Sequence, residues 1–494
     1  MNPWRNIDRL SKQETADLQN KKLHTLINDY LYPFSPHYQK LFDDHKINPK
    51  LIRTAADLKH IPFTSKLDIV STQEAPARYR DFVMQPDKQK IMKHWPAVKQ
   101  VPLALTSVFR GSEYTIDQFN QEFRPVFMTF TTGTTNKPVP FLYSNYDIKN
   151  LYVSGSRMLY LFDIKNTEHI VNMFPYAPHL AFWQVVYGGM ASCALILSTG
   201  GGKVMGTEGN ITALLNMRPT VILGVPSFVY HLLRVAREKN VKLDFIKKVI
   251  LGASRVTIPF KQKLSEMLES MGAKDVKVLG TYGFTEARCA WAECPTSLDV
   301  SSGYHLYPDK EIFEIVDPKT GDVKKEGEDG ELVYTSIDSR ASGVVRYRTG
   351  DFVKGGMTFE PCPHCKRRVP RISSDITRLS DVKDLNLSKI KGSLVNLNNF
   401  FALMAEVRDI EEWQIELRKK DNDPFEMDEL NVYVTPSAGA EKKHVEEEIR
   451  EKMLQATEVA PNAIYCIPID EIVKRLELET ANKEKRIVDA RPKI

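Results

Sequence analysis

A run of hydroxyl-bearing residues with one glycine and one lysine occupies positions 131–137, directly after an apolar segment at 126–130. The run contains Thr131, Thr132, Gly133, Thr134, Thr135 and Lys137. Glycine lets backbone N–H groups approach an anion, threonine hydroxyls donate to phosphate oxygens, and lysine adds a positive charge. The run therefore predicts a loop that wraps a polyphosphate, although its spacing is not that of the GxxxxGK[ST] loop. A polar hairpin turn is the alternative interpretation.

Two further motifs end on carboxylates that suit a bound nucleotide. The first, LGTYGFTE at 279–286, ends on Glu286, a hard oxygen ligand of the kind that Mg²⁺ prefers. The second, RYRTGD at 346–351, ends on Asp351, whose acceptor-only side chain can bind both hydroxyls of a ribose. Solvated surface carboxylates are the alternative interpretation, which the ordered set of motifs disfavours.

The remaining parts of a nucleotide are expected at two strand ends. Gly252, Ala253 and Ser254 follow the apolar run 249–251, where small residues would let adenine lie against the backbone. Tyr282 and Gly283 would place the nucleotide under the end of the next strand. ATP held in this way offers its α-phosphate to a carboxylate oxygen, and the acyl-AMP that results gives the acid a good leaving group.

The elements that must position these motifs alternate between strands and helices. Apolar strand-like runs are interrupted by helical stretches such as 227–238 and 259–271, which predicts an α/β fold with a mostly parallel sheet. The runs lie at 169–174, 194–197, 221–225, 248–251 and 276–280. Hairpin patterns at 312–316 and 330–335 add a β-rich portion, whereas residues 75–125 show no clear period.

The chain is long enough for at least two domains. We expect a large domain at 1–380, which opens with a helical segment at 1–70, and a small α+β domain at 381–494. In the small domain, residues 441–456 predict a helix because Val445, Ile449 and Met453 fall on one face.

The composition is that of an ordinary globular protein. Of 494 residues, 42% are hydrophobic and 27% charged, and the net charge of +5 is spread without the basic stripe of a nucleic-acid binder. No signal-peptide-like segment and no run of about 18 apolar residues is present, so we expect a cytoplasmic protein with no membrane partner. Its six cysteines are then expected to be reduced, and Cys362 and Cys365 form the C-x-x-C half of a zinc site.

The ordered motifs, completed by NKEKR at 482–486, resemble those of the acyl-adenylate-forming (AMP-binding) enzymes, and within them the phenylacetate-CoA ligase-like family. Residues 62–66 and 282–351 are similar to that family nearly segment by segment. The resemblance implies a large adenylate-forming domain with mostly parallel sheets and a β-rich portion, followed by a small mobile α+β domain. It also implies an enzyme that uses ATP, Mg²⁺ and coenzyme A.

The same resemblance implies roles for several more residues. Lys483 is the expected catalytic lysine, which would stabilise charge between the carboxylate and the α-phosphate. Lys485 competes for this role because Asn482 replaces the glycine that precedes the lysine in the family. Thr281 would contact the nucleotide or the carboxylate, and Arg378, in a hinge motif that departs from the family pattern, would reach the ribose.

A structural zinc site is implied as well, because metal-bearing relatives place Cys and His in the corresponding segments. The expected Zn²⁺ ligands are Cys294, His305, Cys362 and Cys365. Cys289 and His364 are possible substitutes, and a set of reduced buried cysteines without metal is the alternative.

The acid pocket is expected between 174–179 and 224–228, with Phe182 and Trp183 nearby, which suits an aromatic or bulky apolar acid. A place in the core is the alternative for these aromatic residues.

The predicted reaction joins a small-molecule carboxylic acid to AMP and passes the acyl group to coenzyme A. Two alternatives remain: an adenylating enzyme with another acceptor, like coenzyme-adenylating or acyl-protein synthetases, or a non-catalytic nucleotide-binding protein. The sequence leaves the oligomeric state open, with a homodimer as one option.

Overall fold

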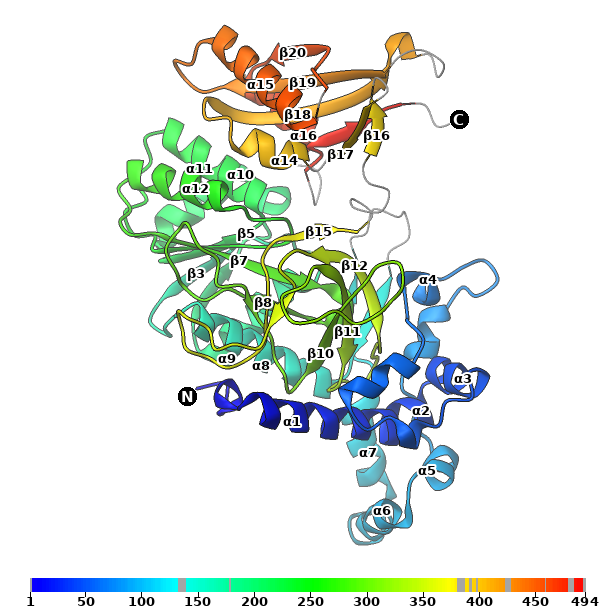
Figure 1. Cartoon of the computed structure of the whole chain (residues 1–494). Coiled ribbons are helices and arrows are strands. Elements are labelled where there is room, and N and C mark those ends of the chain that lie inside the picture. Colours follow the sequence, from blue (N-terminus) through cyan, green and yellow to red (C-terminus); the bar gives the residue numbers. More distant parts are fainter. Residues whose placement is uncertain are drawn as a thin grey trace.

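The computed structural model of the chain shows three parts that follow one another along the molecule (Figure 1). N-terminal helices lie at one end, two large sheets form the middle, and a smaller sheet with its own helices lies at the other end. The structure describes residues 2–131, 139–176, 179–379, 387–390, 393–396, 399–422, 428–457, 459–478 and 484–491. Within these ranges, no helix combines the length and the apolar character that are needed to cross a bilayer.

The N-terminal part is a helical layer under the sheets. Helix α1 (Lys12–Thr25) begins with a capping box, in which the side chains of Ser11 and Glu14 each accept a hydrogen bond from the other's backbone N–H. One π-helical segment, η2 (Leu26–Leu31), continues α1. Shorter helices follow: α2 (Tyr32–Phe34), α3 (Pro36–Asp44), η3 (Pro49–Leu51), η4 (Ala55–His60) and α4 (Lys66–Ile69). The backbone of Thr64 then pairs with that of Tyr347, which ties this layer to the β-rich portion.

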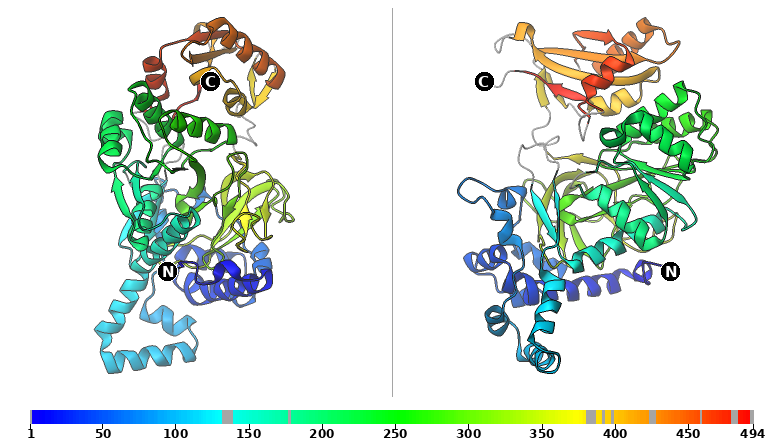
Figure 2. Two further views of the ribbon diagram at one scale, coloured as in Figure 1. Left: turned by 90° about the vertical axis from the view of Figure 1, so that its left-hand side faces the viewer. Right: turned by 180° about the vertical axis from the view of Figure 1, so that it is seen from behind.

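Three helices form an arm that projects from the body (Figure 2). They are α5 (Lys88–His94), α6 (Ala97–Arg110) and α7 (Ser112–Phe123). The arm is anchored at its base by Trp95, whose ring packs against Tyr30 and Phe34 and whose indole N–H donates to the carbonyl of Asp29. The stretch that shows no clear period in the sequence is therefore helical over most of its length.

A nine-stranded sheet forms the centre of the molecule, in the order β13-β14-β9-β8-β7-β6-β5-β3-β4. The strands from β4 to β7 are parallel and those from β8 onwards are antiparallel. Their bounds are β3 (His169–Asn172), β4 (Leu195–Ser198), β5 (Val221–Gly224), β6 (Lys248–Leu251), β7 (Lys277–Phe284), β8 (Cys289–Ala292), β9 (Tyr304–His305), β13 (Met357–Thr358) and β14 (Arg371–Ile372). The apolar runs of the sequence correspond to the parallel strands; the inner strands β5 and β6 are almost fully buried, as strands covered on both faces must be, whereas the edge strand β4 is partly exposed.

Helices cover both faces of the parallel strands (Figures 1 and 2). They are α8 (Asn145–Leu161), α9 (Leu180–Ser192), α10 (Gly202–Met217), α11 (Pro226–Glu238) and α12 (Ile258–Ser270). Helices α8 and α9 approach closely at Gly155 and Gly188, where a Cβ on Gly155 would lie 2.7 Å from the Cα of Gly188. This contact between backbones explains why both positions are glycine.

A second sheet supplies the β-rich portion. It is antiparallel, in the order β10-β11-β12-β15. The strands are β10 (Glu311–Val316), β11 (Gly330–Ser336), β12 (Tyr347–Val353) and β15 (Ile376–Arg378). Cross-strand pairing places Asp351 on β12 opposite Arg378 on β15.

The C-terminal part has its own sheet, in the order β20-β19-β18-β21, and its own hydrophobic cluster. Its elements are β16 (Leu387–Ile390), β17 (Ser393–Asn396), α14 (Asn399–Ala405), β18 (Ile410–Lys419), β19 (Asp428–Pro436), α15 (Lys442–Thr457), β20 (Ala463–Cys466), α16 (Ile469–Leu476) and β21 (Ile487–Asp489). Val445, Ile449 and Met453 are fully buried on one face of α15, as their spacing predicts. The division at residues 380 and 381 stays a prediction.

The C-terminal part contacts helices α11 and α12. Glu411 accepts a hydrogen bond from the hydroxyl of Tyr230 at 2.9 Å and pairs with Arg237 at 3.3 Å. Lys263 donates to the carbonyl of Ile410 at 2.8 Å. These polar contacts hold the small part against one side of the central sheet.

Candidate active site

The stem of the predicted phosphate loop is a two-stranded hairpin. β1 (Phe127–Phe130) and β2 (Pro140–Tyr143) pair antiparallel. Beyond the strands, the backbone N–H of buried Thr131 donates to the carbonyl of Val139, and the hydroxyl of Thr131 accepts from the N–H of Val139, both at 3.0 Å. The hydroxyl of Thr285 donates to the carbonyl of Phe130 at 3.5 Å, which joins this stem to the motif at 279–286. Thr132, Gly133, Thr134, Thr135 and Lys137 lie outside the described residues.

Asp351 is the centre of a hydrogen-bonded cluster at the edge of the β-rich sheet. Its Oδ2 accepts from the hydroxyl of Tyr282 at 2.6 Å, and its Oδ1 pairs with Nη1 of Arg378 at 3.0 Å. The same guanidinium donates to the carbonyl of Thr349 at 3.1 Å. Burial, and then the charge of Asp351, raise the pKa of Tyr282, so its hydroxyl stays a hydrogen-bond donor. Tyr282 and Arg378, which come from two other motifs, therefore both bind the carboxylate of Asp351.

Glu286 lies beside this cluster. Its Oε1 accepts from the hydroxyl of Tyr347 at 2.8 Å, and the charges of Arg378 and Asp351 both act on it. Burial raises the pKa of Glu286 above that of an ordinary glutamate, because the charged form loses hydration. A divalent cation at this carboxylate would offset that penalty, which makes Glu286 a suitable Mg²⁺ ligand.

The ends of β6 and β7 form a wall next to the cluster. The hydroxyl of Thr281 donates to the carbonyl of Leu251 at 3.1 Å, across the parallel pair. A Cβ on Gly252 would lie 2.2 Å from that hydroxyl oxygen, so any larger residue would displace Thr281. Ala253 and Ser254 follow as exposed residues, and Ala253 has a left-handed φ of 69°. The predicted adenine site thus has small side chains and accessible backbone.

Four side chains with metal-binding atoms converge between β8, β9 and the loop after β13. All the candidate ligand atoms of Cys294, His305, Cys362 and Cys365 lie within 4.8 Å of one another. The sulfurs of Cys294 and Cys362 are 3.7 Å apart, close to the edge of about 3.8 Å expected for a tetrahedron with 2.3 Å Zn–S bonds. Nδ1 of His305 lies 3.3 Å from the carbonyl of Ala292, which leaves Nε2, at 3.2 Å from Cys365, to face the cluster.

The two substitutes suggested by the sequence do not belong to this group. Cys289 is buried in the hydrophobic cluster around Trp291, and His364 is exposed. Three thiols and one imidazole at these distances fit a closed Cys₃His zinc site, which has no open position for a substrate.

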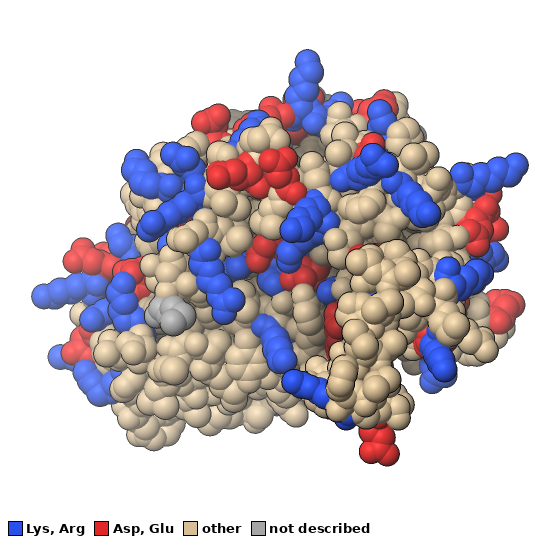
Figure 3. Space-filling view, turned by 90° about the horizontal axis from the view of Figure 1, so that it is seen from below, with Lys and Arg blue, Asp and Glu red and all other residues tan. Residues whose placement is uncertain are grey.

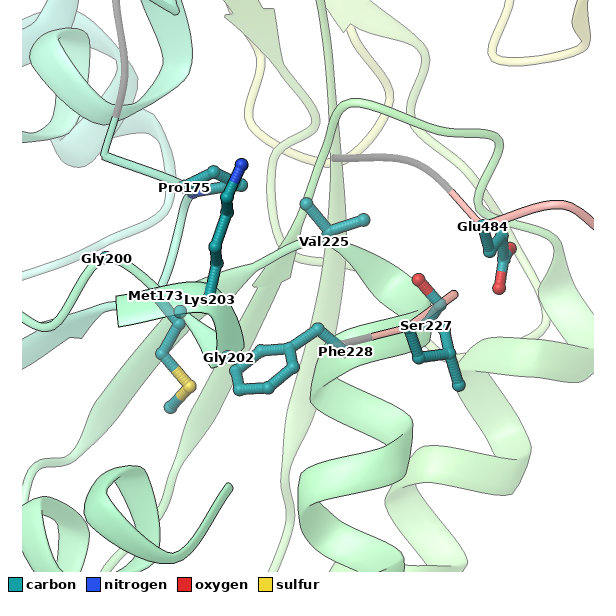
Figure 4. A pocket seen from close by; sticks show the side chains of 11 residues that line it. Met173, Pro175, Gly200, Gly202, Lys203, Val225, Ser227, Phe228 and Glu484 are labelled. Carbon is teal, nitrogen blue, oxygen red and sulfur yellow. The ribbon is translucent and has the colours of Figure 1, made fainter. Parts of the chain in front are cut away.

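A pocket opens where the C-terminal part meets the central sheet (Figure 4). It encloses about 420 Å³, including its open mouth. Apolar side chains of Met173, Pro175, Val225 and Phe228 line it together with the glycines at 200–202. Lys203 and Glu484 lie on opposite sides of this space.

Two aromatic residues expected near the acid are not part of the pocket lining. Phe182 is buried, and its ring packs edge-on against Trp183, with 5.3 Å between the ring centroids. Both rings also contact Tyr176. Phe182 belongs to a buried hydrophobic cluster, and Trp183 is half-buried against it, which favours the core interpretation of these residues.

Comparison with known proteins gives the family. A family profile described as AMP-binding enzyme matches residues 46–339, more than half of the chain. This chain belongs to the AMP-binding enzyme family. Among its relatives, the phenylacetate-coenzyme A ligase of Aromatoleum evansii is 23% identical over 499 residues, which cover 99% of this chain and 97% of that protein. The phenylacetate-coenzyme A ligase of Thermus thermophilus is 26% identical over 380 residues, covering 76% and 73%. The resemblance stated from the motifs is thereby confirmed.

Solved structures show that this AMP-binding enzyme has an adenylate-forming fold, as predicted. The 2-hydroxyisobutyryl-CoA ligase in its postadenylation state aligns with a TM-score of 0.74 and 18% identity, over 98% of this chain and 91% of that one. The same ligase in its thioesterification state aligns with a TM-score of 0.60. The arrangement of the two parts is therefore closer to the postadenylation form.

The C-terminal motif of this AMP-binding enzyme is described only in part. Lys483 lies outside the described residues, whereas Glu484 reaches the pocket wall. Lys485, the competing candidate, is paired with Glu477 at 2.5 Å, and just over half of its side chain is exposed. Arg486 is held by Glu412 at 2.8 Å within the C-terminal part.

Sequence reasoning did not assign a role to Tyr347 or Lys203. Tyr347 holds Glu286, and it belongs to the RYRTGD motif four residues before Asp351, so the motif carried this signal. Lys203 follows the glycines at 200–202 on the pocket wall, and only the folded chain brings it near Val225 and Glu484. No other feature of the sequence distinguishes it from a surface lysine.

Proposed function

We propose that this AMP-binding enzyme activates a carboxylic acid with ATP to an acyl-adenylate and then transfers the acyl group to coenzyme A, giving acyl-CoA, AMP and pyrophosphate. The observation that carries the proposal is the meeting of Tyr282, Glu286, Asp351 and Arg378, from three separate motifs, beside the stem of the predicted phosphate loop. The phenylacetate-coenzyme A ligases among its relatives support the choice of coenzyme A as acceptor.

In the first half-reaction, an oxygen of the acid attacks the α-phosphorus of ATP, and the bond to the bridging oxygen of the leaving pyrophosphate breaks. Asp351 accepts hydrogen bonds from the ribose hydroxyls, while Tyr282 and Arg378 fix the orientation of its carboxylate. Glu286, oriented by Tyr347, would hold Mg²⁺, which would neutralise phosphate charge. Lys483 is proposed to stabilise the charge that develops between the acid and the α-phosphate.

In the second half-reaction, the sulfur of coenzyme A attacks the acyl carbon, the bond from that carbon to AMP breaks, and the thiol proton passes to solvent. The small C-terminal domain is proposed to move between the two steps, as the family resemblance implies, so that one of its faces serves adenylation and another serves thioester formation. The contacts of Glu411 with Tyr230 and Arg237 hold the arrangement that precedes this movement.

We propose an aromatic or bulky apolar acid as the substrate. Met173, Val225 and Phe228 offer an apolar surface to such an acid, in a pocket that the glycines at 200–202 also line. A cytoplasmic location is part of the proposal, because ATP and coenzyme A are available there and free cysteines persist there.

We propose a structural Zn²⁺ at Cys294, His305, Cys362 and Cys365. Its ligands come from chain segments up to 71 positions apart, so the ion would tie the loop after β13 to β8 and β9. Because all four positions are filled by protein atoms, the ion would contribute to stability and not to the reaction.

Pyrophosphate exchange tests the proposal. The purified protein is incubated with ATP, Mg²⁺, labelled pyrophosphate and a panel of carboxylic acids, with and without coenzyme A. We expect acid-dependent exchange that is lost in Lys483→Ala but kept in Lys485→Ala, and thioester only when coenzyme A is added. Exchange without thioester would reject coenzyme A as the acceptor, and no exchange with any acid would reject adenylation.

A further inference from the structure

The arm formed by α5, α6 and α7 presents an unusual helix. In α6, five large apolar side chains fall within an arc of about 100°. They are Val98, Val101, Leu105, Val108 and Phe109. All five are exposed, with Val108 at 78% and Phe109 at 82%. The apolar stripe of this helix therefore faces solvent instead of the protein.

The opposite face of α6, which carries Lys99, Gln100 and the half-buried Leu103, is the one that contacts the protein, and Leu103 packs against the main hydrophobic cluster. Lys99 pairs with Asp29 of the helical layer. Gln100 donates to the carbonyls of Trp95 at 2.6 Å and Met92 at 3.2 Å. An amphipathic helix normally buries its apolar stripe, so the reversed orientation indicates that something else covers this stripe.

The rest of the arm exposes three more large apolar side chains, Met92 on α5 and Tyr114 and Ile116 on α7. At about 100 Å² for each of its five side chains, the stripe of α6 alone exposes about 500 Å², more than half of the about 800 Å² that one partner contributes to a standard interface. Figure 3 views the molecule from below Figure 1, the side to which the arm projects.

The charges of the arm are divided between its two ends. Residues 88–110 contain five Lys or Arg and no Asp or Glu, whereas 112–123 contain three Asp or Glu and no Lys or Arg. Lys88 and Lys93 on α5, and Glu113 and Asp117 on α7, are exposed and form no ion pair with another described residue. An anionic lipid surface would attract the first end and repel the second.

From the reversed helix and the divided charges, we propose that the arm pairs with the arm of a second copy of this chain, with the two α6 helices antiparallel about a two-fold axis. Antiparallel pairing over the length of about 21 Å places Val98 of one copy near Phe109 of the other. It also brings the basic α5 of each copy to the acidic start of α7 in the other, so the surface is complementary to itself. This dimer lies far from the nucleotide site and does not depend on the proposed reaction.

Light scattering after size-exclusion chromatography, over a dilution series of the full chain, tests this pairing. We expect a mass of twice 56.4 kDa for the natural protein. Val108→Glu should give the monomer mass at concentrations where the natural protein is dimeric, while Leu67→Glu, at an equally exposed position (79%) outside the arm, should stay dimeric. A monomer at every concentration, or a dimer that Val108→Glu leaves unchanged, would overturn the proposal.

A charge-exchange experiment tests the antiparallel register. The variant Lys88→Glu with Lys93→Glu, and the variant Glu113→Lys with Asp117→Lys, should each associate at least about tenfold more weakly than the natural protein. An equimolar mixture of the two should restore the dimer mass, because each basic end then meets an acidic one. Failure of the mixture to associate would reject the register. Flotation of monomeric protein with phosphatidylglycerol vesicles would identify a membrane as the occupant instead and reject the dimer.

Discussion

Replacement of Asp351 by asparagine is the sharpest test of the nucleotide site. Asp351→Asn keeps the shape of the side chain but removes the charge that accepts from Tyr282 at 2.6 Å and pairs with Arg378 at 3.0 Å. If the carboxylate also binds the two ribose hydroxyls, its loss weakens two charge-assisted hydrogen bonds of about 1.5 kcal/mol or more each. The total of about 3 kcal/mol corresponds to an increase of about 100-fold in the KM for ATP.

The assay is pyrophosphate exchange at saturating acid, with ATP varied, together with a urea unfolding midpoint for each variant. Asp244→Asn is the matched control, because Asp244 pairs with Arg218 at 2.9 Å, is about half-exposed and precedes β6, whereas the nucleotide site lies beyond the other end of that strand. Tyr282→Phe should raise the KM by about tenfold, since it only loosens the orientation of Asp351. If Asp351→Asn lowers the unfolding midpoint but leaves the KM for ATP within about threefold of the natural value, then Asp351 is a structural residue and the ribose assignment is wrong.

Three other perturbations give separate tests. Cys362→Ser with Cys365→Ser should remove one equivalent of protein-bound zinc, measured by mass spectrometry of the metal, and lower the unfolding temperature; a natural protein free of zinc would contradict the site. Glu411→Gln should weaken the contacts of the C-terminal part with Tyr230 and Arg237. The rate of the thioester step, measured by rapid quench, should then rise by about threefold relative to the rate of adenylation. Equal changes in both rates would contradict this role. Because Glu311 is buried, the free energy of unfolding should depend on pH between about pH 5 and about pH 8, as measured by urea unfolding. Glu311→Gln should abolish this dependence.

The sign of the Glu311 effect follows from its two protonation states. Burial raises the pKa of Glu311 from 4.5 to about 8, against hydrogen bonds from Trp291 and the backbone of Tyr307 that favour the charged form. Between these values the folded state holds a proton that the unfolded state has lost. The free energy of unfolding therefore falls as pH rises through this range, by up to about 1.4 kcal/mol per pH unit. Stability that varies equally with pH in the natural protein and in Glu311→Gln would show that Glu311 is charged when folded.

The central sheet could be predicted from the sequence because parallel strands that are buried on both faces leave continuous apolar runs, such as 221–225 and 248–251. The motifs at 279–286 and 346–351 were found from their residue types and their order along the chain; the first covers the second half of β7 and the second covers the start of β12. Their meeting depends on contacts between the two sheets, from Tyr282 to Asp351 and from Tyr347 to Glu286, and no local pattern records such tertiary contacts.

There is a physical reason why the arm could not be predicted from the sequence. Its helix α6 contains Pro102, and its apolar stripe turns outward, so the usual link between amphipathic period and burial fails there. The position of Lys203 on the pocket wall was likewise unpredictable, because it depends on how helix α10 meets the C-terminal part. The zinc ligands, by contrast, were predicted as a set and do converge, since the C-x-x-C spacing fixes half of such a site locally.

An isotope experiment tests the central claim most directly. An acid that supports pyrophosphate exchange is labelled with ¹⁸O in its carboxylate and converted by the protein with ATP, Mg²⁺ and coenzyme A. An acyl-adenylate requires a carboxylate oxygen to attack the α-phosphorus, so one ¹⁸O must appear in the AMP that is released. Mass spectrometry of AMP should therefore show a gain of one labelled oxygen per thioester formed. Unlabelled AMP, or label found in inorganic phosphate together with ADP, would contradict the account.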